Sequence, residues 1–183
     1  MIEYAARIGS AHAGAPKRVT PKPTTRKPRS EPAAPARTAW IDDTSDPFAR
    51  SAIHESAHAV VSALRGGKIR SVRLYADESG ETLCTVADPY VYVAGAIAEQ
   101  IGGFGRSTGS RDDIQQAGFQ LRLRFSTDRI GFETQRISDV VEQSLRQHWG
   151  AVRALATELL TSGFQLDGAR VHSILRTHGV NAR

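Results

Sequence analysis

The spacing of apolar residues predicts where the ordered elements lie. Apolar side chains recur at helical intervals between Ile53 and Leu64. They follow Asp46-Pro47, an N-cap residue with a first-turn proline, and a pair of glycines ends the run. This pattern predicts a helix over about residues 47–65.

A β-hairpin and another helix are predicted next. Apolar and polar residues alternate over 72–75, turn-forming residues fill 77–80, and 82–86 is again strand-like. Asp88-Pro89 repeats the capping arrangement and begins a helix that should end at Gly102-Gly103.

The remainder of the chain is predicted to be helical. Ser110 can cap a third helix that extends to about Phe125. Apolar residues then recur at near-helical spacing over 137–159, although Gly150 weakens continuity there, and a last short helix follows Leu166-Asp167-Gly168. The expected fold is therefore mainly α (α+β), with one small β-hairpin.

The N-terminal segment has a different composition. Residues 1–39 hold eight Lys and Arg against two acids, and six of the eight prolines. Because the whole chain carries +5, residues 40–183 are close to neutral. We predict a disordered basic tail over 1–39 and a folded domain over 40–183. The tail fits a solubilising leader better than an electrostatic tether, so nucleic acid is not an expected partner.

Composition excludes several classes of protein. Apolar runs fall short of the roughly 20 residues that cross a bilayer, so no membrane span is expected. The one cysteine, Cys84, excludes a disulfide framework and a Cys-rich zinc site, so a metal would need histidines and carboxylates. The N-terminus lacks a secretory signal pattern, and a cytoplasmic location is expected.

The first predicted helix carries a metal-binding pattern. His54-Glu55-Ser56-Ala57-His58 matches H-E-x-x-H, in which two histidines four residues apart share one helix face. Two imidazoles so placed can bind one Zn²⁺, and Glu55 beside them can act as a general base. The alternative without a metal is a surface helix with two solvated histidines, but small and apolar residues flank the pair closely.

Spacing alone leaves the third metal ligand open. Asp112 and Asp113 follow a glycine-bearing loop that can approach the first helix, and Glu99 lies among small residues that allow close helix packing. Each has a structural alternative. Ser110-x-x-Asp113 resembles a helix capping box, and Glu99 could lie on a solvated helix face.

Three segments, taken in order, resemble the peptidase domain of the FtsH family. They are residues 53–61, 94–101 and 107–117, which correspond approximately to HEAGHA, AGRAAEE and STGASNDLQQA in that family. The resemblance covers about residues 52–176, and more weakly includes an "LDG"-like turn near the C-terminus. It implies a zincin-like helical metallopeptidase domain.

The resemblance also implies roles for individual residues. His54, His58 and Asp113 would bind Zn²⁺, Glu55 would be the catalytic base, and Glu99 would orient a ligand or pack the site. In one departure from the family, Asp112 replaces an asparagine and adds a charge beside the implied ligand, so it remains an alternative ligand.

The expected function is zinc-dependent cleavage of unfolded or flexible polypeptides. FtsH proteins carry a membrane anchor and an ATPase, whereas this sequence has neither an apolar span nor a G-x-x-x-x-G-K-S/T loop. We therefore expect a stand-alone endopeptidase, with a separate ATPase or adaptor as a further partner. The family forms hexamers, so a homo-oligomer is compatible with the resemblance. The alternative is a catalytically silent binding or oligomerisation module, in which replacing Glu55 would leave biological activity intact.

Overall fold

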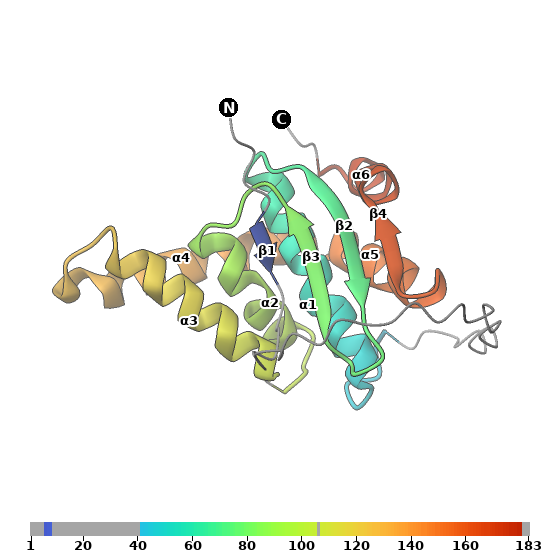
Figure 1. Ribbon diagram of the computed structural model, residues 1–183, viewed down its shortest axis with the longest axis horizontal. Coiled ribbons are helices and arrows are strands. Elements are labelled where there is room, and N and C mark those ends of the chain that lie inside the picture. Colours follow the sequence, from blue (N-terminus) through green and yellow to red (C-terminus); the bar gives the residue numbers. More distant parts are fainter. Residues whose placement is uncertain (1–5, 9–40, 106, 181–183) are drawn as a thin grey trace, which may run out of the picture.

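A computed structural model of the chain describes residues 6–8, 41–105 and 107–180 (Figure 1). This part contains six helices and four strands, which confirms the predicted mainly helical α+β fold. The elements are β1 (Ala6–Ile8), α1 (Pro47–Leu64), β2 (Ile69–Leu74), β3 (Gly80–Cys84), α2 (Pro89–Ile101), α3 (Thr108–Arg122), α4 (Thr127–Gln147), α5 (Trp149–Thr161), β4 (Gln165–Asp167) and α6 (Gly168–Thr177).

Helix α1 is the centre of the fold. It lies behind the sheet and packs against α2 on one side and α5 on the other (Figure 1). Its residues from Ala52 to Ala63 are all buried, including the polar ones. Asp46 caps its N-terminus by accepting a hydrogen bond from the Phe48 amide, as the sequence predicts. The helix that carries H-E-x-x-H is therefore enclosed by its neighbours and is not a surface helix.

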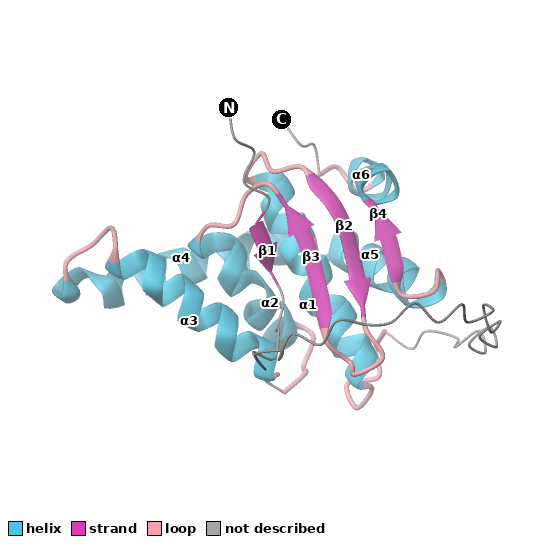
Figure 2. Ribbon diagram, in the orientation of Figure 1, coloured by secondary structure: helices cyan, strands magenta, loops and turns pink. Residues whose placement is uncertain are grey.

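The strands form one antiparallel sheet in the order β1-β3-β2-β4 (Figure 2). The predicted hairpin is confirmed as β2 and β3, with Val72 opposite Thr82. The two outer strands are short and were not expected. In β4, buried Leu166 pairs with Val72 of β2, so a segment predicted as a turn is a strand.

Two helix boundaries differ from the prediction. Helix α3 is capped by Ser107, whose hydroxyl accepts a hydrogen bond from the Ser110 amide at 3.1 Å, so the predicted cap at Ser110 is wrong by three residues. The near-helical segment 137–159 divides at His148, two residues before the glycine that weakened its prediction, and becomes α4 and α5.

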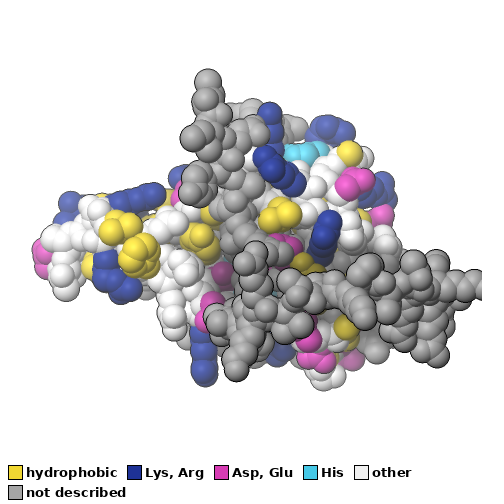
Figure 3. Space-filling view, in the orientation of Figure 1, with side chains coloured by type: hydrophobic (Ala, Val, Ile, Leu, Met, Phe, Trp, Pro, Cys, Tyr) yellow, Lys and Arg dark blue, Asp and Glu magenta, His cyan; other side chains and the backbone are white. Residues whose placement is uncertain are grey.

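Helices α3 and α4 form an arm that extends away from the sheet (Figure 1). Hydrophobic side chains are exposed along this arm (Figure 3), among them Phe119, Leu123 and Phe132. Among the described helices, none is both long enough and apolar enough to cross a membrane.

The basic N-terminal segment is described only in part. Ala6–Ile8 form β1, which pairs with β3, so these three residues are ordered where a disordered tail was predicted. The rest of the predicted tail, residues 1–5 and 9–39, lies outside the described residues.

Candidate metal centre

Three buried side chains from two helices converge on one point. The Nε2 atoms of His54 and His58, both on α1, are 2.9 Å apart. Asp113 of α3 places its Oδ2 atom 3.0 Å from each of them. The three residues are at most 5% exposed. The structure thus brings Asp113 to the paired histidines and supplies three ligand atoms at one place.

The hydrogen bonds on the far side of each imidazole fix its protonation. His58 Nδ1 lies 2.7 Å from the carbonyl oxygen of Val91, which can only accept, so Nδ1 carries the proton. His54 Nδ1 lies 2.9 Å from Oε1 of Glu99, whose carboxylate likewise accepts. In neutral imidazoles both Nε2 atoms therefore present lone pairs to each other and to Asp113, and this arrangement needs a cation between them.

In the metal-free protein, a proton on His54 takes the place of this cation. Burial lowers the pKa of His54, but its hydrogen bonds with Asp113 and Glu99 outweigh burial and raise the pKa to about 10. Burial alone would raise the pKa of Asp113, but the neighbouring His58 and His54 rings hold it well below its ordinary value. A carboxylate beside a protonated His54 is the state that a metal ion replaces by displacing the proton.

The spacing of the three atoms fits a small cation. Ligand atoms that are 2.0–2.1 Å from a tetrahedral metal stand about 3.3 Å apart. The observed separations of 2.9 and 3.0 Å are close to this value, and a small outward movement would complete the geometry. The cluster of His54, His58 and Asp113 could therefore hold a metal ion.

Glu99 belongs to the surroundings of the cluster, because it contacts the opposite nitrogen of His54 from the one that faces Asp113. Its Oε2 atom accepts hydrogen bonds from the Ser107 amide at 3.0 Å and the Ser110 hydroxyl at 2.6 Å. Burial opposes ionisation of Glu99, but its hydrogen bond with His54 and those from the two serines lower its pKa. Glu99 is thus a charged acceptor that orients His54 and is itself fixed by the start of α3.

The alternative interpretation of Asp113 as a helix cap is wrong. The hydroxyl that caps α3 belongs to Ser107, and the Asp113 carboxylate points to the histidines. Asp112 is exposed and lies on the rim of the adjacent cleft, away from the three converging atoms.

Glu55 lies beside the cluster and is held by the sheet. The Thr82 hydroxyl of β3 is 2.8 Å from its Oε2 atom and 2.9 Å from its backbone carbonyl, and donates its one proton to one of them. Burial raises the pKa of Glu55, and the charges of His58 and His54 oppose this shift only in part. Gly80 passes so close that a Cβ atom there would lie 2.7 Å from Glu55 Oε1.

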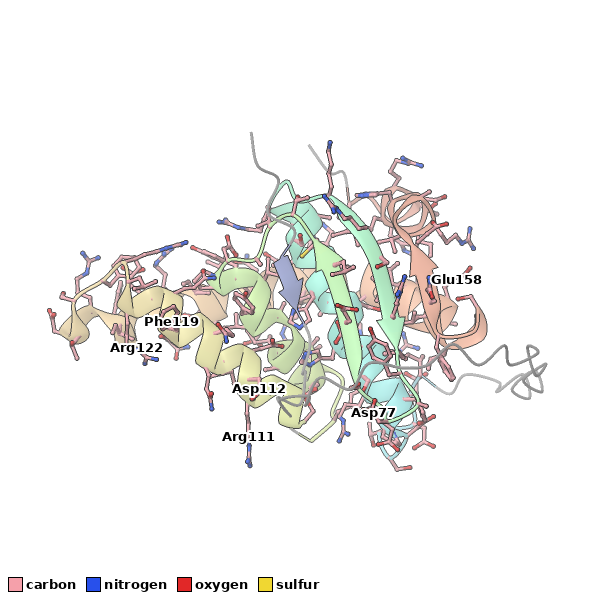
Figure 4. The ribbon with its side chains drawn as sticks, in the orientation of Figure 1. Asp77, Arg111, Asp112, Phe119, Arg122 and Glu158 are labelled. Carbon is pink, nitrogen blue, oxygen red and sulfur yellow. The ribbon has the colours of Figure 1, made fainter. Side chains whose placement is uncertain are left out.

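A cleft gives access to this region. It is bounded by α1, by the turn between β2 and β3, and by the start of α3, and both His54 and Glu55 line it. Figure 4 labels Asp77 at the turn and Asp112 on α3, which border it from different elements. Five acidic residues line the cleft, against one arginine, Arg50.

Apart from Glu99, sequence reasoning missed the residues that fix the site from outside α1. Thr82 and Gly80 were seen only as strand and turn residues, and Ser107 as part of a loop. Gly95 of α2 lies against the ring of His54, with no room for a Cβ atom between the helices. The run of small residues in α2 was the available signal, since it indicates close helix packing.

Comparison with known proteins adds no assignment. No protein-family model matches the chain, and no curated protein matches it at a significant level. The interpretation of the cluster therefore depends on its residues and their geometry.

Proposed function

We propose that the protein is a zinc-dependent endopeptidase. The observation that supports this most strongly is the convergence of His54, His58 and Asp113 with Glu55 beside them at a cleft. Two imidazole nitrogens and one carboxylate oxygen are a ligand set that zinc favours, whereas Ca²⁺ and Mg²⁺ prefer six or more oxygen ligands. Three protein ligands also leave one tetrahedral position for water or substrate, as catalytic zinc sites do.

Bound in this cluster, zinc would act as a Lewis acid and would lower the pKa of a coordinated water to about 7. Glu55 would accept a proton from the attacking water and deliver it to the amide nitrogen that leaves. Because Thr82 contacts Oε2, Oε1 is the atom placed to exchange that proton. The raised pKa of Glu55, caused mainly by burial, makes its carboxylate a stronger base than an exposed glutamate.

The remaining residues would keep this arrangement fixed before substrate arrives. Glu99 and the Val91 carbonyl hold the Nδ1 protons of the two histidines, so that both Nε2 lone pairs face the cluster. Ser107 and Ser110 fix Glu99 in turn. The site thus needs little rearrangement, which favours catalysis.

The substrates would be unfolded or flexible polypeptides. The resemblance of three segments to the FtsH peptidase domain supports peptide hydrolysis. The cleft lies next to Gly80, the first residue of β3, and β3 would offer an edge to an extended chain once β1 has left it. Unfolded substrate would come directly from solution, or from a separate ATPase or adaptor.

Replacing Glu55 tests the proposal. Glu55→Gln keeps the size and the Thr82 contact but removes the base, so it should still bind one zinc per chain while hydrolysing a denatured, carboxymethylated protein at least 100-fold more slowly. The matched control is Glu142→Gln, the same change at an exposed position of α4 outside the cleft, which should retain wild-type hydrolysis. Digestion by Glu55→Gln at the wild-type rate, or by protein stripped of metal, would contradict the proposal.

A further inference from the structure

Strand β1 lies where it can control access to the site. Ala6–Ile8 pair with the side of β3 that β2 leaves open, with Ile8 opposite Thr82. Thr82 is the residue whose hydroxyl contacts Glu55. Thr82 therefore contacts both parts: its backbone lies opposite β1, and its side chain contacts the carboxylate that we propose as the base.

The direction of β1 places its last residue, Ile8, nearest the cleft. Because β1 is antiparallel to β3, it passes Cys84 first and Thr82 last, and it ends on the side where Gly80 begins β3. Gly80 and the turn before it line the cleft. Figure 1 shows β1 beside β3, at the edge of the sheet on the side of α2.

Without β1, β3 would have an unpaired edge. Such an edge presents free N–H and C=O groups to any extended chain and is a template for strand addition. The other edge of the sheet, β4, lies two strands away from β3. An extended polypeptide that is to lie beside Glu55 would thus pair on the side of β3 that β1 occupies.

We propose that β1 is an internal competitor that occupies the polypeptide-binding edge of β3 and must leave before an extended substrate can pair beside Glu55. This regulation rests on the proposed peptidase function. Two features make the strand displaceable. β1 has three residues, so it makes only a few backbone hydrogen bonds, each of which changes an equilibrium constant by about fivefold. Its substantial contacts with described elements are with β3 alone.

Charge also favours this position of β1. Residues 1–39 carry eight basic residues and two acidic ones. The rim of the cleft carries Asp77, Glu78 and Asp112. Because opposite charges attract, this charge difference favours the pairing of β1 close to the cleft.

Proline substitution in β1 tests this inference in the full-length, zinc-loaded chain. Successive residues of a strand point their N–H groups to opposite sides, so either Arg7 or Ile8 directs its N–H to β3. The double substitution Arg7→Pro/Ile8→Pro removes this N–H in both cases. The matched control, Arg7→Gln/Ile8→Val, loses the same positive charge but keeps both N–H groups.

Two measurements are made in a Glu55→Gln background, so that neither depends on hydrolysis. Hydrogen–deuterium exchange of the β3 amides should be at least tenfold faster in the proline pair than in the control. The Kd for a fluorescein-labelled, carboxymethylated polypeptide should be about tenfold lower in the proline pair. Unchanged exchange, or faster exchange with an unchanged Kd, would overturn the inference.

The same variants with Glu55 restored separate the two proposals. Tenfold tighter binding without hydrolysis in any variant would refute the peptidase function and leave β1 as a competitor for the edge. Equal binding and equal hydrolysis in the proline pair and its control would refute the competitor role and leave the peptidase function standing.

Discussion

Gly95→Ala should disrupt the metal centre from a neighbouring helix. A Cβ atom on Gly95 would overlap three ring atoms of His54, where non-bonded carbon atoms need about 3.5–4.0 Å. The ring must move by about 1 Å, so it cannot keep both the contact with Glu99 and its place in the cluster. Loss of an orienting partner alone lowers metal affinity 10–100-fold, and displacement of the ligand adds to this. We expect zinc affinity to fall by about 100-fold or more, measured by competition with a chromophoric chelator.

The fold should survive this change. Alanine is favoured over glycine in a helix by about 1 kcal/mol, which offsets part of an overpacking cost of about 1–3 kcal/mol. Chemical denaturation of the metal-free protein should therefore give a free energy of unfolding within about 2 kcal/mol of wild type. The matched control is Gly131→Ala on α4, where a Cβ atom meets open space and zinc affinity should not change. Wild-type zinc affinity in folded Gly95→Ala would refute the packing of His54 against α2.

Three further changes test separate parts of the site. Gly80→Ala should displace the Glu55 carboxylate and slow hydrolysis at least tenfold, while the zinc content stays at one per chain. Equal losses of zinc and of activity would show that Gly80 does not act on Glu55 alone. Asp113→Asn should weaken zinc binding at least 100-fold, whereas Asp112→Asn on the rim should leave it unchanged. Titration of both variants with zinc shows which of the two acids binds the metal. Zinc affinity should rise with pH, by up to tenfold per pH unit between pH 6.5 and 8. The reason is that zinc displaces a proton from His54, whose pKa is raised to about 10. An affinity that does not change with pH would show that no such proton is released.

The sequence was sufficient for the elements whose signals are local. The caps at Asp46 and Asp88, each followed by proline, identified the starts of α1 and α2 correctly. Helical geometry alone then placed His54 and His58 on one face, because residues four apart lie one turn apart. These predictions required no knowledge of the rest of the chain.

The third ligand could not be predicted from spacing, because Asp113 lies 59 residues from His54 and reaches it through the packing of α3 on α2. Asp112 and Glu99 were equally plausible in local terms, and their places on the rim and behind His54 depend on that packing. The resemblance to the FtsH peptidase domain implied Asp113, and the structure places the Asp113 carboxylate beside both histidines.

The two short outer strands had no usable local signal. Three residues cannot show a period, and pairing with a distant strand supplies hydrogen bonds that the local sequence does not specify. Ala6–Ile8 also belong to a segment whose composition resembles that of disordered chains. Long-range pairing therefore decided the structure at both edges of the sheet.

Zinc K-edge X-ray absorption of the purified, zinc-loaded protein tests the proposed metal centre most directly. The spectrum should show four light-atom ligands at about 2.0–2.1 Å, with the multiple-scattering features of two imidazoles. Asp113→Asn should change this spectrum, because it alters the carboxylate that meets both histidines. Zinc surrounded by six oxygen atoms, or a spectrum without imidazole scattering, would show that His54 and His58 do not hold the ion.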